Sequence, residues 1–154
     1  AVLENDPLKS VKSIGLLPFS FFKKKFIALG EARVSLDLVE KDILMQRYLD
    51  PRIHFALNCA SQSCPPLRAE PYRGHLLEAQ LAAQTRLFAH SERAAQVDEA
   101  AQRVAYSRLF KWYADDFAVP HPAQYLNRYR QQALPMHYAI GWLDYDWSLN
   151  AVSH

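Results

Sequence analysis

The stretch from Asp50 to Arg68, DPRIHFALNCASQSCPPLR, holds the most decisive pattern in this chain. It opens on an Asp-Pro pair, which is expected to end a preceding helix because the residue before a proline avoids the helical region. Apolar and polar residues then alternate from Arg52 to Cys59, which predicts a strand. One side of this strand would carry Ile53, Phe55, Leu57 and Cys59, and the other His54, Ala56 and Asn58. The chain's two cysteines, Cys59 and Cys64, would then lie at the end of the strand and in the loop before Pro65-Pro66.

The predicted strand restricts which cysteine can work with which histidine. A strand rises about 3.3 Å per residue, so His54 and Cys59 would lie about 16 Å apart on opposite faces. A nucleophile and its base must come within about 3 Å of each other, so these two residues would not pair directly. The loop can carry Cys64 back beside the strand, which makes Cys64 the better candidate nucleophile, with His54, His75 or His137 as its base.

The loop around the cysteines allows several interpretations. Ser61 and Ser63 suit a loop whose amides and hydroxyls stabilise a thiolate or another anion. A Cys59–Cys64 disulfide is one alternative, and burial of Cys59 as a small apolar side chain is another. A metal site built from His54, Cys59 and Cys64 lacks the two-residue spacing typical of zinc knuckles, so no metal is expected.

A second group of candidate residues lies in SRLFKWYADDF, from Ser107 to Phe117. Its aromatic residues recur at helical spacing and are explained as core. Lys111, Trp112 and Asp116 are not explained in this way and could line a polar cleft. With Asn58, Ser61, Ser63 and Arg68, they complete the set of candidate ligand-binding residues.

Composition narrows the class of protein. The chain has 154 residues, of which 50% are hydrophobic, so we expect a single domain over residues 1–154. Lys and Arg number 18 against 16 Asp and Glu, a balance that gives no strong field for nucleic acid. No apolar run approaches the ~20 residues of a membrane span, and no motif indicates a cofactor.

Periodicity and breaker residues outline the remaining elements, in which helices and strands mix without regular alternation. This predicts an α+β fold with a small mixed or antiparallel sheet packed with helices. The expected helices run from Ser35 to the Asp50-Pro51 stop, from Gly74 to Ala89, through the turn capped by Ser107, and from Pro122 to near Pro135; the expected strands, besides that of Arg52–Cys59, are Val104–Ser107, Tyr138–Trp142 and Tyr145–Leu149.

Several blocks together resemble the domain of unknown function 547 family. They are SLDLVEKDIL, DPRIHFALNCASQSCPPLR, LLEAQL, SRLFKWYADDF and YDWSLN, in that order. The resemblance implies a fold similar to the papain and transglutaminase-like group, with an N-terminal helical element of the family domain missing from this chain. It also implies export to the periplasm or the extracellular space, since bacterial members are often exported. Both cysteines follow the His54 segment, an order that departs from the papain-like group.

Two functions follow as hypotheses. The first is a thiol-dependent site that binds a small thiol or peptide ligand such as glutathione, with Cys64 or Cys59 forming a mixed disulfide or attacking a carbonyl. The second is a non-catalytic interaction module, in which Cys59 and Cys64 form a disulfide and the aromatic segment from Tyr138 to Trp147 packs a core or a protein partner.

Overall fold

A computed structural model describes residues 8–15 and 17–150 of the chain. The described residues form two compact units. Unit 1 contains the residues up to Asp50, the Cys59–Cys64 loop and the segment from Asp146 onward; unit 2 contains Pro51–Asn58 and Pro65–Tyr145. The expected single domain includes residues 1–7, 16 and 151–154, which lie outside the described residues, and it stays a prediction.

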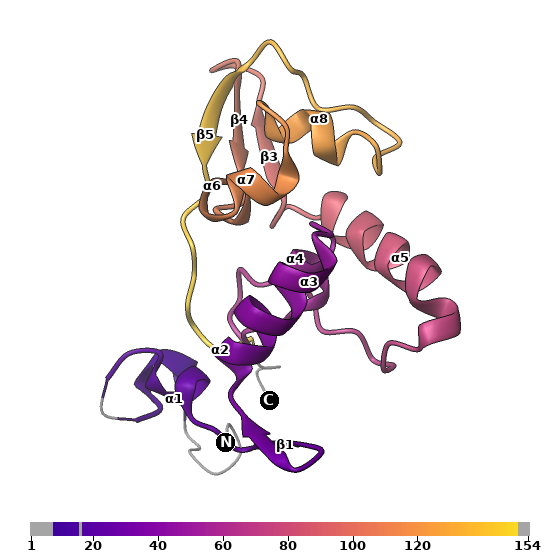
Figure 1. Ribbon diagram of the computed structural model, residues 1–154. Coiled ribbons are helices and arrows are strands. Elements are labelled where there is room, and N and C mark those ends of the chain that lie inside the picture. The colour runs from indigo at the N-terminus through magenta and orange to yellow at the C-terminus, as the bar shows by residue number, and fades with distance from the viewer. Residues whose placement is uncertain (1–7, 16, 151–154) are drawn as a thin grey trace. The chain divides into compact units, whose positions relative to one another are not determined.

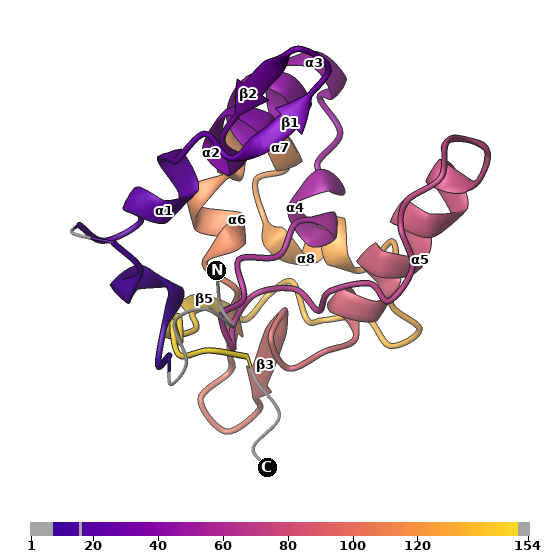
Figure 2. The same cartoon turned by 90° about the horizontal axis from the view of Figure 1, so that it is seen from below.

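Unit 1 combines short helices with a β-hairpin (Figures 1 and 2). Strands β1 and β2 pair antiparallel, with Ile27 opposite Val34, and Gly30 at φ 60° allows the turn between them. The elements of this unit are the 3₁₀ helix η2 (Val11–Ser13), α1 (Ser20–Lys23), β1 (Ile27–Leu29), β2 (Ala32–Val34), α2 (Leu36–Leu38), the π-helix η3 (Val39–Met45) and α3 (Gln46–Tyr48).

The helix predicted from Ser35 is confirmed as the continuous run of α2, η3 and α3. Ser35 Oγ accepts a hydrogen bond from the backbone N–H of Leu38 at 3.1 Å, which satisfies one of the donors that a helix start leaves without a partner. The run ends where Leu49 adopts a left-handed conformation at φ 39°, just before Asp50-Pro51. Leu49 was predicted to lie on the buried face, but 83% of it is exposed.

Unit 2 holds the longest helix and a three-stranded sheet. Its elements are α4 (Ile53–Ala56), the 3₁₀ helix η4 (Gly74–Leu76), α5 (Leu77–Ala89), β3 (Ala95–Asp98), β4 (Arg103–Tyr106), α6 (Leu109–Trp112), α7 (Ala114–Phe117), α8 (Pro122–Leu126) and β5 (Ala139–Trp142). The chain is thus α+β, as its sequence predicts. No helix in the described part of the chain is long and apolar enough to cross a membrane.

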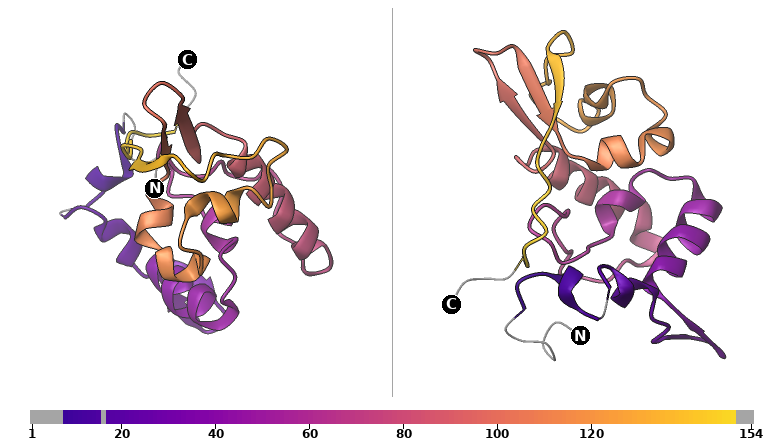
Figure 3. Two further views of the ribbon diagram at one scale, coloured as in Figure 1. Left: turned by 90° about the horizontal axis from the view of Figure 1, so that it is seen from above. Right: turned by 90° about the vertical axis from the view of Figure 1, so that its left-hand side faces the viewer.

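The sheet is mixed, with the strand order β3-β4-β5 (Figure 3, right). β3 and β4 run antiparallel, whereas β4 and β5 run parallel, with Val104 opposite Ile140. The strands predicted at Val104–Ser107 and Tyr138–Trp142 therefore form. The strand predicted at Tyr145–Leu149 does not, because its segment makes only an isolated bridge, between Leu149 and Ser61 of the cysteine loop.

The strand predicted from Arg52 to Cys59 is wrong. Residues Ile53–Ala56 form the helical turn α4, and the chain becomes extended at Leu57. Ile53, His54 and Phe55 are all buried, although an alternating strand would bury every second residue. When a short apolar run is buried on several sides, its periodicity does not tell whether it is a strand or a helical turn. The ~16 Å separation expected for His54 and Cys59 therefore no longer applies.

Phe55 of α4 is central to the core of unit 2. It is fully buried and its ring stacks on Phe88 of α5, with centroids 4.9 Å apart. Phe110 and Phe117 were predicted as core, and their ring centroids lie 6.1 and 5.7 Å from that of Phe55. Phe55 was expected on the apolar side of a strand. It does lie in the core, but it belongs to a helical turn.

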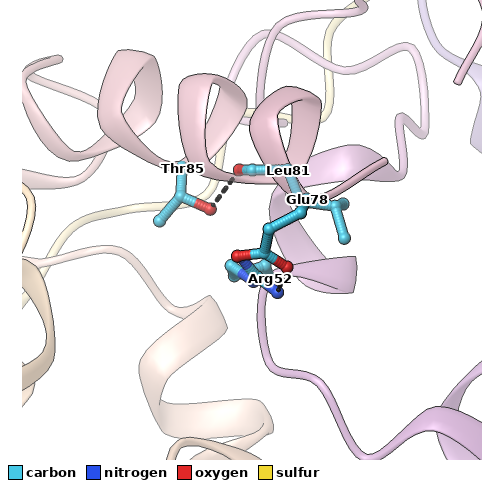
Figure 4. Close-up of polar contacts among 4 residues, drawn as sticks. All are labelled: Arg52, Glu78, Leu81 and Thr85. Atoms are coloured by element: carbon cyan, nitrogen blue, oxygen red, sulfur yellow. Dashed lines mark hydrogen bonds and ion pairs between the residues drawn. The ribbon is translucent and has the colours of Figure 1, made fainter. Parts of the chain in front are cut away.

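Polar contacts attach α5 to its surroundings. Arg52 donates to both carboxylate oxygens of Glu78 at 2.6 and 2.8 Å, and Thr85 Oγ1 donates to the carbonyl of Leu81 within the helix (Figure 4). Polar residues on a helix ordinarily face solvent, and the sequence of α5 predicts this for Gln80 and Gln84, but both are buried. They lie inside because loop backbone groups bond to their amides, and an amide with such partners is tolerated in a core.

We expect Gln84→Ala to lower the free energy of unfolding by about 1–3 kcal/mol, because the buried Gln84 Nε2 donates to the carbonyl of Pro66 at 2.5 Å. Urea denaturation of the full chain measures this change. Gln131→Ala is the control, since Gln131 is exposed and should change stability by no more than about 0.5 kcal/mol. Equal effects of the two substitutions would contradict a structural role for the Gln84 amide.

Candidate functional site

The cysteine loop of unit 1 is shaped by its own backbone. Ala60 adopts a left-handed conformation at φ 62°, which is uncommon for a residue other than glycine. The N–H of Cys64 then donates to the carbonyl of Ser61 at 3.1 Å, closing a tight turn. The loop therefore returns toward its own beginning at Cys59, although the strand beside which Cys64 was expected to return does not form.

Each sulfur of the loop has a polar neighbour. The backbone N–H of Cys59 donates to Cys64 Sγ at 2.9 Å, and Cys59 Sγ lies 3.1 Å from Ser61 Oγ. No disulfide joins the two cysteines. Cys64 is buried, with 5% of its surface exposed, and Cys59 is half-buried. In the contact between Cys59 and Ser61 either atom can be the donor. An N–H or O–H that donates to sulfur favours the thiolate form, which is the reactive one.

The segment from Asp146 to Asn150 fastens this loop. Ser148 O and Asp146 O accept from the N–H groups of Gln62 and Ser63 at 2.9 and 3.2 Å. Ser63 Oγ accepts from the N–H of Asp146 at 2.9 Å, so this predicted ligand-binding residue holds the backbone instead. Hydrogen bonds from Ser148 lower the pKa of Asp146, whose carboxylate accepts from the Ser148 N–H at 2.8 Å. The loop is therefore ordered by backbone pairing to a distant part of the sequence.

In unit 2, Asn58 and Pro65 stand on either side of the cysteine loop in the sequence. Asn58 Nδ2 donates to the carbonyl of Pro65 at 2.7 Å, which ties the two ends of the loop together. Asn58 was predicted to bind ligand, and this contact gives its amide a structural role.

His54 of α4 is bonded to Asp116 of α7, also within unit 2. His54 Nε2 lies 2.8 Å from Asp116 Oδ2, and Tyr113 stacks on the imidazole with ring centroids 4.0 Å apart. Burial lowers the pKa of His54 below its usual value, and this effect outweighs the opposing hydrogen bond and charge of Asp116. Asp116 itself is substantially exposed, with 44% of its side chain accessible. A histidine held by a carboxylate is the arrangement of a base and its orienting group.

The other candidate residues of unit 2 have separate surroundings. Lys111 Nζ lies 5.9 Å from the centroid of the Trp142 ring, and the Trp112 ring packs 4.9 Å from that of Tyr145. Arg68 forms a long ion pair with Glu70, with Nη2 and Oε2 3.6 Å apart. Of the residues predicted from Ser107–Phe117, only Asp116 therefore bonds to His54.

Sequence reasoning missed the role of Tyr113, which it assigned to the core, and the pairing of His54 with Asp116. His54 and Asp116 are 62 positions apart in the sequence, so no local sequence pattern predicts that they pair. Within residues 8–15 and 17–150, no group of three or more His, Cys, Asp or Glu side chains is arranged to hold a metal ion.

We expect the free energy of unfolding to fall as the pH drops below about 6.5, the ordinary pKa of histidine. The folded-state pKa of His54 is lowered, so below that pH the unfolded chain binds more protons than the folded one and acid favours unfolding. The contribution of one such group is at most about 1.4 kcal/mol per pH unit. Urea denaturation at several pH values between 5 and 8 measures this pH dependence, because histidine changes its charge in about this range.

His54→Gln should flatten this pH dependence, and Asp116→Asn should extend it to lower pH, because Asp116 favours the protonated ring. His75→Gln serves as the control, because His75 is exposed in η4. An unaltered pH profile in His54→Gln would show that another group titrates.

Comparison with known proteins places the first part of the chain in a family. The family model described as Protein of unknown function, DUF547, matches residues 1–89, which is more than half of the 154 residues. The matched part contains SLDLVEKDIL, the cysteine stretch and LLEAQL, whereas SRLFKWYADDF and YDWSLN lie beyond it. No curated protein and no solved structure matches the chain significantly. The chain belongs to the DUF547 family of proteins of unknown function.

Proposed function

We propose that the Cys59–Cys64 loop is a site for thiol–disulfide exchange with a small thiol or peptide ligand such as glutathione. The observation that carries the proposal is the 2.9 Å contact between the Cys59 N–H and Cys64 Sγ. It brings the second sulfur to the backbone of the first cysteine and gives that sulfur a donor that favours the thiolate. The 3.1 Å contact of Cys59 Sγ with Ser61 Oγ supports the same role for Cys59.

The exposure of the two cysteines decides which of them reacts first in this proposal. Cys59 is half-buried and Cys64 is buried, so Cys59 is the sulfur that an incoming disulfide reaches first. The Cys59 thiolate attacks one sulfur of the ligand disulfide, a new S–S bond forms, and one ligand thiolate leaves and takes up a proton.

Cys64 completes the exchange. Its thiolate attacks the Cys59 sulfur of the mixed disulfide, which releases the second ligand thiolate and forms a Cys59–Cys64 disulfide. The ligand disulfide gains two electrons and becomes two thiols, while the protein dithiol loses two electrons and its two protons. Export to the periplasm or the extracellular space, which we also propose, would supply an environment in which such a disulfide persists.

Acyl transfer is the second candidate, and it corresponds to a papain- or transglutaminase-like arrangement as the finer form of the α+β fold. The observation that raises it is the 2.8 Å pairing of His54 with Asp116 within unit 2, which suits a base and its orienting carboxylate and says nothing of where the cysteines of unit 1 lie. The two reactions leave different marks on the protein, a mixed disulfide in one case and a thioester in the other. In a third reading, the non-catalytic interaction module, ligand disulfide leaves the protein unmodified.

We expect oxidised glutathione to add one glutathione to Cys64→Ser through Cys59. In the unsubstituted chain it should instead yield mainly the Cys59–Cys64 disulfide, because Cys64 displaces the bound thiol. Intact-mass and peptide mass spectrometry under non-reducing conditions distinguish the two products. Cys59→Ser is the matched variant and should be modified far more slowly, since Cys64 is buried. Absence of both products, or faster modification of Cys59→Ser, would refute the proposed order.

Ser61→Ala should slow the alkylation of Cys59 by iodoacetamide at pH 7 by roughly three- to tenfold, because the hydroxyl that stabilises its thiolate is removed. Ser63→Ala is the control from the same loop, since the Ser63 hydroxyl bonds the Asp146 N–H rather than sulfur. Rates followed by peptide mass spectrometry on Cys64→Ser backgrounds isolate Cys59. Equal slowing in both variants would assign the effect to loop order instead.

A further inference from the structure

The segment from Pro65 to Arg73 in unit 2 is an irregular loop with fixed ends. Gln84 Nε2 donates to Pro66 O at 2.5 Å, and Gln80 Nε2 donates to Pro71 O at 3.1 Å. Gln80 Oε1 also accepts from the N–H of Arg73 at 2.8 Å. Because both glutamines belong to α5, the loop is attached to a regular helix at each end and presents its side chains from a defined backbone.

Two side chains of this loop carry polar atoms that the rest of the described chain does not satisfy. Arg68 Nε and Tyr72 Oη are buried, and within residues 8–15 and 17–150 neither has a hydrogen-bond partner. Glu70 does not satisfy Arg68, because its Oε2 is 3.6 Å from Nη2, beyond hydrogen-bond length, and its side chain is 74% exposed. Buried polar atoms without a partner are uncommon in folded proteins, and each calls for an explanation such as strain, an ordered water or a bound ion.

The guanidinium and the phenol share one environment. Burial raises the pKa of Tyr72, and the positive charge of Arg68 acts in the opposite direction on the same hydroxyl. Arg68 Nε–H can only donate, whereas the Tyr72 hydroxyl can donate or accept, and the two groups are not bonded to each other. The partner that satisfies both is an oxygen, and a guanidinium prefers one that carries negative charge, as in a carboxylate or a phosphate.

We propose that Arg68 and Tyr72 form a binding site for an oxyanion, the carboxylate or phosphate group of a small ligand. The site lies within unit 2 and is independent of the thiol chemistry of Cys59 and Cys64. The sequence analysis included Arg68 among the candidate ligand-binding residues, and it gave Tyr72 no role. The Tyr72 hydroxyl, which has no partner in the described chain, gives the site a second donor beside Arg68. Two donors at one site favour an oxygen acceptor as the ligand group.

Titration of the full chain with inorganic phosphate and, separately, with acetate at constant ionic strength tests this site. We expect saturable binding by calorimetry and a shift of the Arg68 Nε–Hε resonance in ¹H–¹⁵N spectra. Tighter binding of phosphate would identify a phosphate-bearing ligand, and tighter binding of acetate a carboxylate ligand; either supports the site. If neither anion binds saturably, the proposal is overturned, and water satisfies these donors.

Three variants separate the site from general attraction of anions. Arg68→Gln should weaken binding about tenfold or more, and Tyr72→Phe, which keeps the ring, by about three- to tenfold. Arg73→Gln removes the same charge from the same loop, but the anchoring contact of Arg73 is made by its backbone, so affinity should stay unchanged. A loss in Arg73→Gln equal to that in Arg68→Gln, or unchanged affinity in Tyr72→Phe, would rule the site out.

Discussion

The hydrogen bond from Asn58 Nδ2 to the carbonyl of Pro65 is one constraint on the backbone around the cysteine loop, and the backbone pairing of the loop with Asp146–Asn150 is another. At 2.7 Å the bond from Asn58 ties together the residues that immediately precede and follow Cys59–Cys64. Closing so short a loop costs conformational entropy, and the closing contact must supply a compensating free energy. The left-handed Ala60 and the turn from Ser61 to Cys64 belong to the same closed conformation. The meeting of Cys64 Sγ with the Cys59 amide follows from this geometry.

In other loops of the chain, too, side chain amides bond backbone groups that no helix or strand pairs. Gln80 and Gln84 hold the Pro65–Arg73 loop by bonding its backbone, and Gln62 Nε2 bonds the carbonyl of Leu149. Proline-rich segments have few N–H groups to offer a sheet or a helix, so their carbonyls need donors from side chains. Glutamine and asparagine side chains provide these donors, and a defined loop can then carry reactive or binding groups.

Sequence patterns predicted the elements whose signals are local. The Ser35 cap, the α5 helix and the strands β4 and β5 follow from capping and periodicity over a few residues. The Arg52–Cys59 segment failed because Ile53, His54 and Phe55 are buried together, which alternation does not describe. Gln80 and Gln84 failed because polar residues on a helix are ordinarily assigned to solvent, and their loop partners are distant in sequence. The return of the cysteine loop was expected beside a strand that does not form, and the contacts of His54 with Asp116 and Tyr113 were not predicted, since tertiary packing alone creates them.

The contacts of the two sulfurs favour exchange over acyl transfer on chemical grounds. A thiolate attacks a disulfide without a general base, and the leaving sulfur also needs little assistance. Acyl transfer from a poor leaving group needs a base that moves a proton during the reaction. The polar neighbours given to sulfur in the loop are an amide N–H at Cys59 and the Ser61 hydroxyl, which stabilise negative charge without titrating near neutral pH. His54, the candidate base, is buried with its Nε2 already bonded to Asp116, and its lowered pKa reflects that burial. The proposed exchange requires the loop to hold a thiolate and needs no general base.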